Sequence, residues 1–480
     1  MAHTRLKPNC LGFTELLAQA IALISPTMTA ALIVPVMYSN TGDWSWLPYA
    51  LGTIMLLFVA YNLNQFARRS AGAGSMYAYT CRGLGLTAGG ISGWALIWAY
   101  LGISMAGTTG ASIFADTLLG MINIHIHFIV LFAACNLISW FCAWKNVQLS
   151  AVLMLALEGI SVAFILLLSF IVLFQHHFAV DAPQFQVSAL PWSSVGLGVV
   201  VAVFSLVGFE CATAFGDEAR NPLRTIPKAV YWSLIISGVF FVFITYVEVM
   251  GTRGYSTTLD KIDAPLNVLA QLAHVPALQV ILSAGAMVSF FALNLSTINA
   301  GGRVIYAMGR HGLFHASTAQ SHSTNETPHV AVTIMALIAF AVPSAAIIGG
   351  VAPLDAFNYV GTCAAFGFIV AYTLVTIAAP VYLMRLGELK TKDVIGCVAA
   401  VVLLAIPAVG SVYPIPDPPV NYFPYAFLVY LAIGIVWIVS FYRRKPAAVA
   451  VARQDLDRSH DRYQEDVRAM PKAAQPLPST

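Results

Sequence analysis

The chain has 480 residues, of which 59% are hydrophobic and only 9% are charged. A soluble domain carries roughly a quarter charged residues, so this composition excludes an ordinary soluble protein and indicates an integral membrane protein surrounded by lipid. The formal net charge is +3 and the basic residues are scattered over short connections, which argues against nucleic acid as a partner.

Apolar stretches that can cross a bilayer recur along nearly the whole chain. A helix needs about 20 apolar residues to span roughly 30 Å of hydrocarbon. The stretches that meet this requirement are residues 14–38, 47–67, 88–119, 126–144, 148–174, 194–217, 229–250, 277–308, 330–350, 355–384, 394–413 and 423–442. We therefore predict an all-α polytopic membrane protein. Its transmembrane domain covers residues 14–443, after a cytoplasmic N-terminus at 1–13 and before a disordered polar tail at 444–480.

The positions of lysine and arginine predict the orientation of these spans. In short loops the two residue types stay on the cytoplasmic side of the membrane. If the N-terminus is inside, all of the 24 lysine and arginine residues except Arg253 and Lys261 fall on the cytoplasmic side. We therefore expect twelve spans with both termini in the cytoplasm, and a location in the plasma (inner) membrane.

The first span contains a proline near its middle, in the sequence IALISPTMTAALIVP. Proline lacks an N–H group and interrupts a continuous helix at a cost of about 3 kcal/mol, whereas Ser-Pro is a favourable start for a new one. We predict two half-helices that meet at Ser25 and Pro26, with the N–H groups of Thr27, Met28 and Thr29 lacking helical partners at mid-membrane. A kink that serves packing alone is the alternative.

The sixth span has a second interruption, in the sequence FSLVGFECATAFGDE. Gly208 and the ionisable Glu210 lie there within apolar sequence, opposite the Ser25–Pro26 break when the two spans are offset by their starts. The predicted topology makes these spans antiparallel. Interrupted helices at equivalent positions of two inverted halves point to the binding site of a transporter.

Three stretches resemble the amino acid, polyamine and organocation transporters. They are GFECATAFGDEARNPLRTIPKAV at residues 208–230, ARRSAGAGSMYAYTCRGLG at 67–85 and GRVIYAMGRHGLF at 302–314. The resemblance implies five plus five helices in inverted repeat, with broken helices 1 and 6. The repeats would cover about 14–174 and 194–384, and helices 11 and 12, at 394–442, would be additional.

The resemblance also implies which residues bind the substrate. In such transporters the substrate's carboxylate is held by backbone N–H groups at the first break and its amine by carbonyl groups at the second. Carried onto this sequence, Ser25, Thr27, Met28 and Thr29 would hold the carboxylate, and Phe204, Ser205 and Gly208 the amine. Phe209 resembles the aromatic gate over the substrate. This chain has Ser-Pro-Thr where many relatives have glycines, which removes one backbone donor.

Two carboxyl groups inside the spans are candidates for coupling transport to protons. Glu158 lies near the middle of the fifth span, where some similar transporters have a lysine in place of a bound cation, and Glu210 lies beside the second break. A charge at this depth is costly, so each is a functional hypothesis, with helix packing as the alternative. Hydroxyl groups at Ser296 and Thr297 could serve sodium, but such groups more often bond to backbone.

These observations favour a secondary active transporter that moves amino acids by alternating access. No metalloprotease HExxH or nucleophile GxSxG sequence lies in the spans, so we expect no enzyme activity, no resident metal and no cofactor. An amine or polyamine transporter of the same fold is the alternative, and a channel or receptor is less favoured because paired breaks indicate a gated central site.

Overall fold

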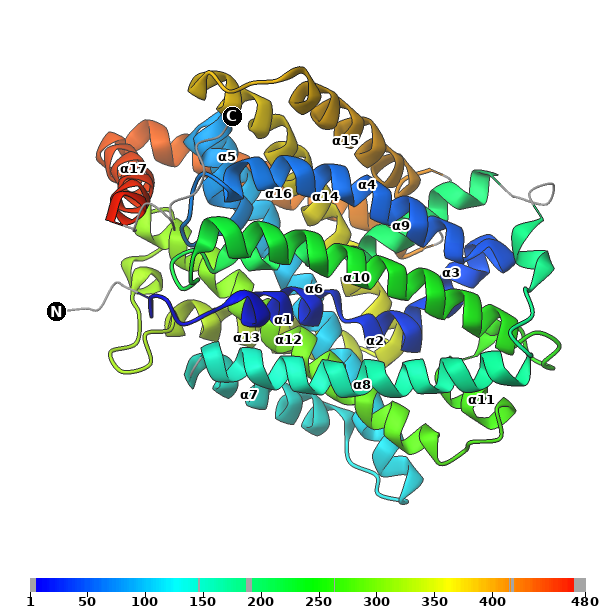
Figure 1. The fold of residues 1–480 in the computed structure, drawn as a ribbon. Helices are drawn as coiled ribbons and strands as arrows, with labels where there is room; N and C mark the ends of the chain where they lie inside the picture. The colour runs from blue at the N-terminus through cyan, green and yellow to red at the C-terminus, as the bar shows by residue number, and fades with distance from the viewer. Residues whose placement is uncertain are drawn as a thin grey trace.

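The structure is a computed structural model that describes residues 6–145, 147–186, 192–262, 264–413, 415 and 418–469. Long helices run along a common direction and form a bundle (Figure 1). Within the described residues, twelve segments are long and apolar enough to cross a membrane. They are Phe13–Trp44, Trp46–Ala67, Leu86–Met121, Phe128–Lys145, Ala156–Gln175, Ser194–Ala214, Pro222–Gly251, Leu278–Arg310, His329–Ile348, Pro353–Leu386, Thr391–Gly410 and Val420–Arg444. The predicted all-α polytopic class is confirmed.

Most spans are continuous helices. These are α4 (Trp46–Ala67), α6 (Leu86–Met121), α7 (Phe128–Lys145), α8 (Val147–Gln175), α10 (Pro222–Gly251), α12 (Leu278–Arg310), α13 (His329–Ile348), α14 (Pro353–Leu386), α15 (Thr391–Gly410) and α16 (Phe423–Arg444). The connections contain α5 (Ser75–Leu84) and α11 (Pro265–Leu272), together with the short 3-10 turns η2 (Gly42–Trp44), η3 (Ala182–Phe185), η6 (Leu259–Lys261), η7 (Ala316–Ala319) and η8 (Val420–Tyr422).

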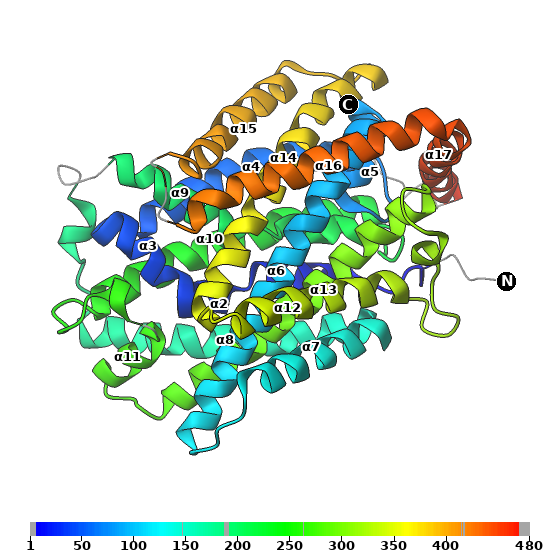
Figure 2. The same cartoon turned by 180° about the vertical axis from the view of Figure 1, so that it is seen from behind.

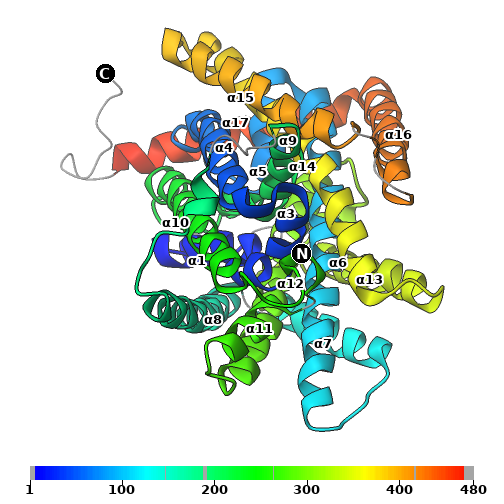
Figure 3. The same ribbon diagram turned by 90° about the vertical axis from the view of Figure 1, so that its right-hand side faces the viewer.

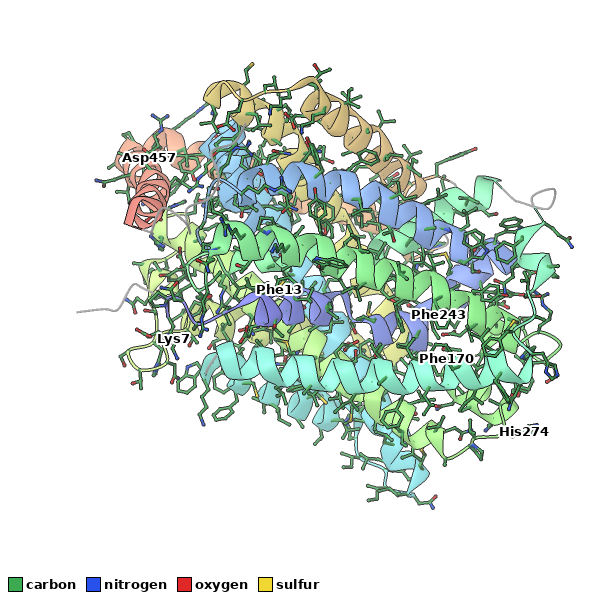
Figure 4. All side chains as sticks on the ribbon, viewed as in Figure 1. Lys7, Phe13, Phe170, Phe243, His274 and Asp457 are labelled. Carbon is green, nitrogen blue, oxygen red and sulfur yellow. The ribbon has the colours of Figure 1, made fainter. Side chains whose placement is uncertain are left out.

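The bundle has two ends, which we name the terminal face and the distal face. Lys7 and Asp457 lie at the terminal face, and His274 lies at the distal face (Figure 4). The view from behind places the N-terminal segment and helix α17 at the same end (Figure 2). Seen from the distal face, the first span lies among α8, α10 and α12, with which it packs (Figure 3).

Small residues let the long helices cross closely at the centre of the bundle. A Cβ atom added to Gly107 of α6 would lie 2.9 Å from the backbone nitrogen of Asn294 in α12. One added to Gly102 would lie 2.8 Å from the carbonyl oxygen of Val360 in α14. In membrane proteins such contacts replace the hydrophobic effect as a source of helix association, so α6 forms a fixed support for α12 and α14.

The first span is broken where its proline predicted. Helix α1 (Phe13–Ile24) ends before Ser25, which has φ 50° and ψ 73°, and a new helix begins as α2 (Pro26–Met28). A π-helical turn, η1 (Thr29–Ile33), and α3 (Val34–Thr41) complete the span. A positive φ is strained for serine, and single π turns occur frequently at functional sites.

The sixth span is broken at Gly208. Helix α9 (Trp192–Leu206) ends two residues earlier, and the 3-10 helix η5 (Phe209–Ala214) follows. Gly208 has φ 108°, and a Cβ atom there would lie 2.2 Å from Leu23 Cδ2 in α1. Glycine is needed for both reasons, because other residues disfavour this φ and would collide with Leu23. The two breaks therefore touch each other.

The terminal face is tied together by hydrogen bonds between distant segments. The N–H groups of Cys10 and Leu11 donate to the carbonyl oxygen of Glu218 at 2.9 and 3.1 Å, and the N–H of Arg220 donates to Leu11 at 2.7 Å. The Glu218 side chain forms an ion pair of 2.5 Å with Arg303 of α12, and both side chains are fully buried. Breaking one partner of such a pair is costly, so these contacts tie the N-terminal segment, the end of the sixth span and α12 together.

Part of the segment expected to be a disordered tail, 444–480, is helical, and residues 470–480 lie outside the described residues. Residues Pro446–Ala469 form helix α17, which lies against the terminal face. Asp455 pairs with Arg310 and with His311 at the end of α12, and Arg82 donates to the carbonyl oxygen of Leu456 at 3.1 Å. Burial alone would raise the pKa of Asp455, but His311 and Arg310 lower it. These tertiary contacts, which composition does not reveal, give the polar segment a place to fold.

Candidate functional site

The residues predicted to bind substrate meet at the centre of the bundle. They come from the two breaks, and almost all have buried side chains. Phe204 is partly exposed, and the buried ones are Ser25, Thr27, Met28, Thr29, Ser205 and Phe209. Gly208 lies against Leu23, one residue before the end of α1. The structure thus brings together two segments that are about 180 residues apart in the sequence.

The N–H groups of Thr27, Met28 and Thr29 have partners inside the protein. Thr27 lacks a helical partner, as predicted, whereas Met28 and Thr29 each have one, contrary to the prediction. The N–H of Thr27 donates to Glu158 Oε1 at 3.2 Å. The N–H groups of Met28 and Thr29 donate to the carbonyl oxygen of Ser25 at 2.9 and 3.4 Å. The reason is the turn at Ser25, which points its carbonyl back at the start of α2, and a carboxyl group brought in from α8.

Glu158 occupies the position where a substrate's carboxylate is expected. Its Oε1 atom also accepts a hydrogen bond from the hydroxyl of Thr27 at 3.1 Å, and only 2% of the residue is exposed. A helix N-terminus favours an anion because its N–H groups and its dipole are positive. The protein's own carboxyl group therefore takes the anion site at the start of α2.

Hydroxyl groups form further contacts between the first break and helices α8 and α12. Thr27 Oγ1 lies 2.8 Å from Ser161 Oγ in α8, and Ser25 Oγ lies 3.0 Å from Ser289 Oγ in α12. Thr29 Oγ1 is buried and has no hydrogen-bond partner among the described residues. These contacts link the first break to both α8 and α12, so a change in charge at Glu158 affects three spans.

The second break is held by Glu210, which follows Gly208 by two residues. Glu210 Oε1 accepts from the Tyr100 hydroxyl at 3.1 Å, and Oε2 accepts from the Tyr372 hydroxyl at 2.7 Å and from the Gly208 N–H at 3.0 Å. The residue is fully buried. Its carboxyl group therefore joins the break to α6 and α14. The ring of Phe209 packs on Tyr372 with centroids 5.4 Å apart.

The remaining residues of the second break contact α4 and α14. Ser205 Oγ lies 3.4 Å from the hydroxyl of Tyr49 in α4 and donates to the carbonyl of Val201. The ring of Phe204 packs against Gly361 of α14, where an added Cβ would lie 2.5 Å from Phe204 Cζ. Phe204 and Ser205 thus lie in the last turn of α9, beside the break.

Sequence reasoning missed Tyr49, Tyr100 and Tyr372. Each is a fully buried tyrosine in an apolar span, and a buried hydroxyl needs a partner, which is the signal that could have found them. The hydroxyls proposed as sodium ligands are instead directed at backbone. Ser296 donates to the carbonyl of Gln19 at 2.7 Å and Thr297 to that of Leu293 at 2.6 Å.

Most of the deeply buried acidic and basic side chains among the described residues are glutamates. Among the described residues of the spans and their ends, Glu158, Glu210, Glu218 and Glu248 are each at most 2% exposed. Arg303 is fully buried too, but it pairs with Glu218. Buried carboxylates need a cation, a proton or hydrogen-bond donors, so the interior favours cations and protons over anions.

At the distal face, Arg253 joins two acidic side chains. Its guanidinium lies 3.0 Å from Asp43 and 2.7 Å from Asp181. Burial would lower the pKa of Arg253, but its hydrogen bonds to Asp181 and Asp43 raise it overall. The network connects the end of the first span with the segments after α8 and α10 at the distal face.

Comparison with known proteins identifies the class. The sequence model of the amino acid permease family matches residues 15–449, which is nearly the whole membrane portion. The chain therefore belongs to the amino acid permease family, whose members are multi-pass membrane transporters and not enzymes.

Individual relatives are similar at low identity. The branched-chain amino acid permease BcaP of Bacillus subtilis is 24% identical over 349 residues, which cover 69% of this chain and 73% of the relative. The low-affinity putrescine importer PlaP of Escherichia coli strain K12 is 25% identical over 341 residues, covering 69% and 71%. The human cationic amino acid transporter 4 is 24% identical over 356 residues, covering 68% and 53%.

Proposed function

We propose that this protein is a secondary active transporter that takes up amino acids across the plasma membrane by alternating access. The observation that carries the proposal is the contact of two broken spans at Leu23 and Gly208, each break with its own buried glutamate. The family and the branched-chain relatives support an amino acid as the substrate.

In this proposal the terminal face is cytoplasmic and the distal face is external. The basic loops support that orientation. The five-plus-five inverted repeat, at about 14–174 and 194–384, would place the two breaks at equivalent positions of opposed halves. The hydrogen bonds of the terminal face and the distal ion pairs would then be contacts that break in turn during transport.

Proton coupling follows from the hydrogen bonds of Glu158. The carboxylate of Glu158 and that of an amino acid compete for the Thr27 N–H, and two anions there repel each other. When Glu158 takes a proton from outside, it becomes a weaker acceptor, and the substrate's carboxylate can replace it at Thr27. Release of substrate to the cytoplasm returns the N–H to Glu158, which gives up its proton there. One proton thus accompanies one amino acid.

A small amine is the second candidate substrate, and one observation favours it. Glu158 already fills the anion site at α2, and the interior is rich in acidic groups, so a cation without a carboxylate could bind beside ionised Glu158. The putrescine importer among the relatives agrees with this candidate.

Transport by purified protein in liposomes separates the two candidates. Uptake is measured for amino acids and for their decarboxylated analogues at two external pH values. An amino acid substrate should be taken up faster at acidic pH, because protonated Glu158 frees Thr27. An amine should be taken up faster at neutral pH, because ionised Glu158 attracts it. Failure to accumulate any member of either series would refute the proposed function.

A further inference from the structure

Glu248 is a buried acid that has no part in the site described above. It lies in α10, three residues before the helix ends at Gly251, and none of it is exposed. Neither carboxyl oxygen has a hydrogen-bond partner among the described residues. The hydroxyl of Thr245, one turn earlier, also lacks a partner there. In the sequence this site is marked by one acidic residue in the apolar run FITYVEVMG. The signal is weak because an acidic residue near the end of a span is common at the membrane surface.

The energetic argument concerns the charge of this carboxyl group. An ionised carboxylate that is removed from water without a cation or donors is highly unfavourable, whereas the neutral acid costs far less. The next cation along the chain, Arg253, is already paired with Asp43 and Asp181. The neutral form is therefore the one that fits the closed distal end.

The residues next to Glu248 on α10 pack against elements of the distal end. Its neighbour Val249 packs with Val34 of α3 and with Leu259 and Ile262 in and beside η6. A Cβ atom at Gly251 would lie 2.4 Å from Leu269 of α11 and 2.9 Å from Val172 of α8. If these elements separate, as alternating access requires at the external end, water reaches Glu248.

Few titratable groups face this carboxyl group. Tyr49 of α4 interacts with it electrostatically. The elements around it also carry Tyr61 of α4, Glu158 of α8 and Tyr38 of α3. Helix α10 itself carries Arg224, Lys228, Tyr231 and Tyr246, and Asp43, Arg253, Asp260 and Lys261 lie at the distal surface. The sequences of α9, α11 and η1 contain none. The hydroxyl of Tyr49 also lies 3.4 Å from Ser205 Oγ, beside the second break.

We propose that Glu248 is a proton-binding site of the external gate, protonated when the gate is closed and ionised when it is open. Closing transfers a proton from the external water to the Glu248 carboxylate, and opening returns it to the same side. This proton is not carried across the membrane. Acid outside therefore favours closure, and alkaline conditions oppose it. The external position of this gate rests on the proposed function.

The first test measures the proton directly, and it needs no transport. Infrared spectra of the purified protein in lipid are compared for the wild type and Glu248→Gln. We expect a band of a protonated carboxyl group at neutral pH that the variant lacks. Asp116→Asn is the matched control, because Asp116 is an exposed acid near the distal end of α6 and should leave the band in place. If the Glu248→Gln spectrum retains every protonated-carboxyl band, the proposal is wrong.

The second test uses the gate in liposomes with the internal pH fixed. At about pH 8 outside, where the proposal has Glu248 ionised in the open gate, Glu248→Gln should take up substrate several-fold more slowly than the wild type, whereas at about pH 5 the two should be alike. The ratio of protons to substrate and the acid stimulation assigned to Glu158 should remain. Glu248→Met, which keeps the volume and removes the polar atoms, should fold at least as well and behave alike. An unchanged pH profile in both variants would refute the gate, whereas absence of uptake in the wild type would refute only the proposed function.

Discussion

At both breaks a buried glutamate accepts a hydrogen bond from a backbone N–H group, but the two glutamates come from different parts of the chain. At the second break, Glu210 is two residues from the Gly208 N–H that it accepts, and two tyrosines hold it. At the first break, Glu158 is 131 positions from Thr27 and comes from another helix. The second break therefore binds a local carboxyl group that has several donors, and the first binds a carboxyl group from a distant part of the chain.

This difference assigns separate roles to the two acids. A carboxyl group with three donors from three segments is a fixed structural joint, because moving it leaves buried donors unpaired. A carboxyl group that binds one residue at a helix N-terminus can exchange with another anion at lower cost. We expect Glu210 to be needed for the geometry of the site and Glu158 to be needed for its response to pH.

The largest effect is expected for Glu210→Gln. Both carboxyl oxygens accept hydrogen bonds, so either orientation of the amide places an NH₂ group against a buried donor. Breaking such a buried network costs about 3–5 kcal/mol, which corresponds to a loss of uptake of more than about 100-fold. Tyr372→Phe, which removes one donor, should lose about tenfold. Transport by Glu210→Gln at the wild-type rate would show that the second break does not need this joint.

The backbone of the second break is tested by Gly208→Ala. Alanine at φ 108° is strained by about 1–3 kcal/mol, and its Cβ would collide with Leu23. We expect a lower melting temperature and at least about tenfold slower uptake. The control is Gly159→Ala beside Glu158, where an added Cβ meets no atom within 4 Å. That variant should keep its activity, and equal damage from both substitutions would contradict the argument.

The breaks were predictable because their causes are local. A proline after serine at 25–26 and a glycine at 208 each determine the backbone at their own position, and the structure breaks both spans there. The partners were not predictable. Thr27 meets Glu158, and Glu210 meets Tyr100 and Tyr372, across separations of more than 100 positions that depend on how the helices pack. Composition likewise could not foresee that Asp455 holds α17 on the terminal face.

A smaller effect on rate is expected for Glu158→Gln. The amide oxygen can still accept from Thr27, so the fold should persist, but the side chain can no longer take up a proton. Maximal uptake of an amino acid should change by no more than about tenfold, and its increase at acidic pH should disappear. Measuring uptake against external pH in the same liposomes checks this. Acid stimulation that survives the substitution would exclude Glu158 as the coupling group.

The smallest effect concerns the hydroxyl pair of the first break. Ser25→Ala and Ser289→Ala each remove the same 3.0 Å hydrogen bond, at a cost of about 1 kcal/mol in the free energy of unfolding. Because they share one interaction, the double variant should cost less than the sum of the singles by about 0.5–1 kcal/mol. Ser283, which also lies on α12 but bonds to Asn267 of α11, provides the control, since Ser25→Ala and Ser283→Ala should add. Additivity in both pairs would mean that the first break is not joined to α12, and that a substrate could loosen it by displacing Glu158 alone.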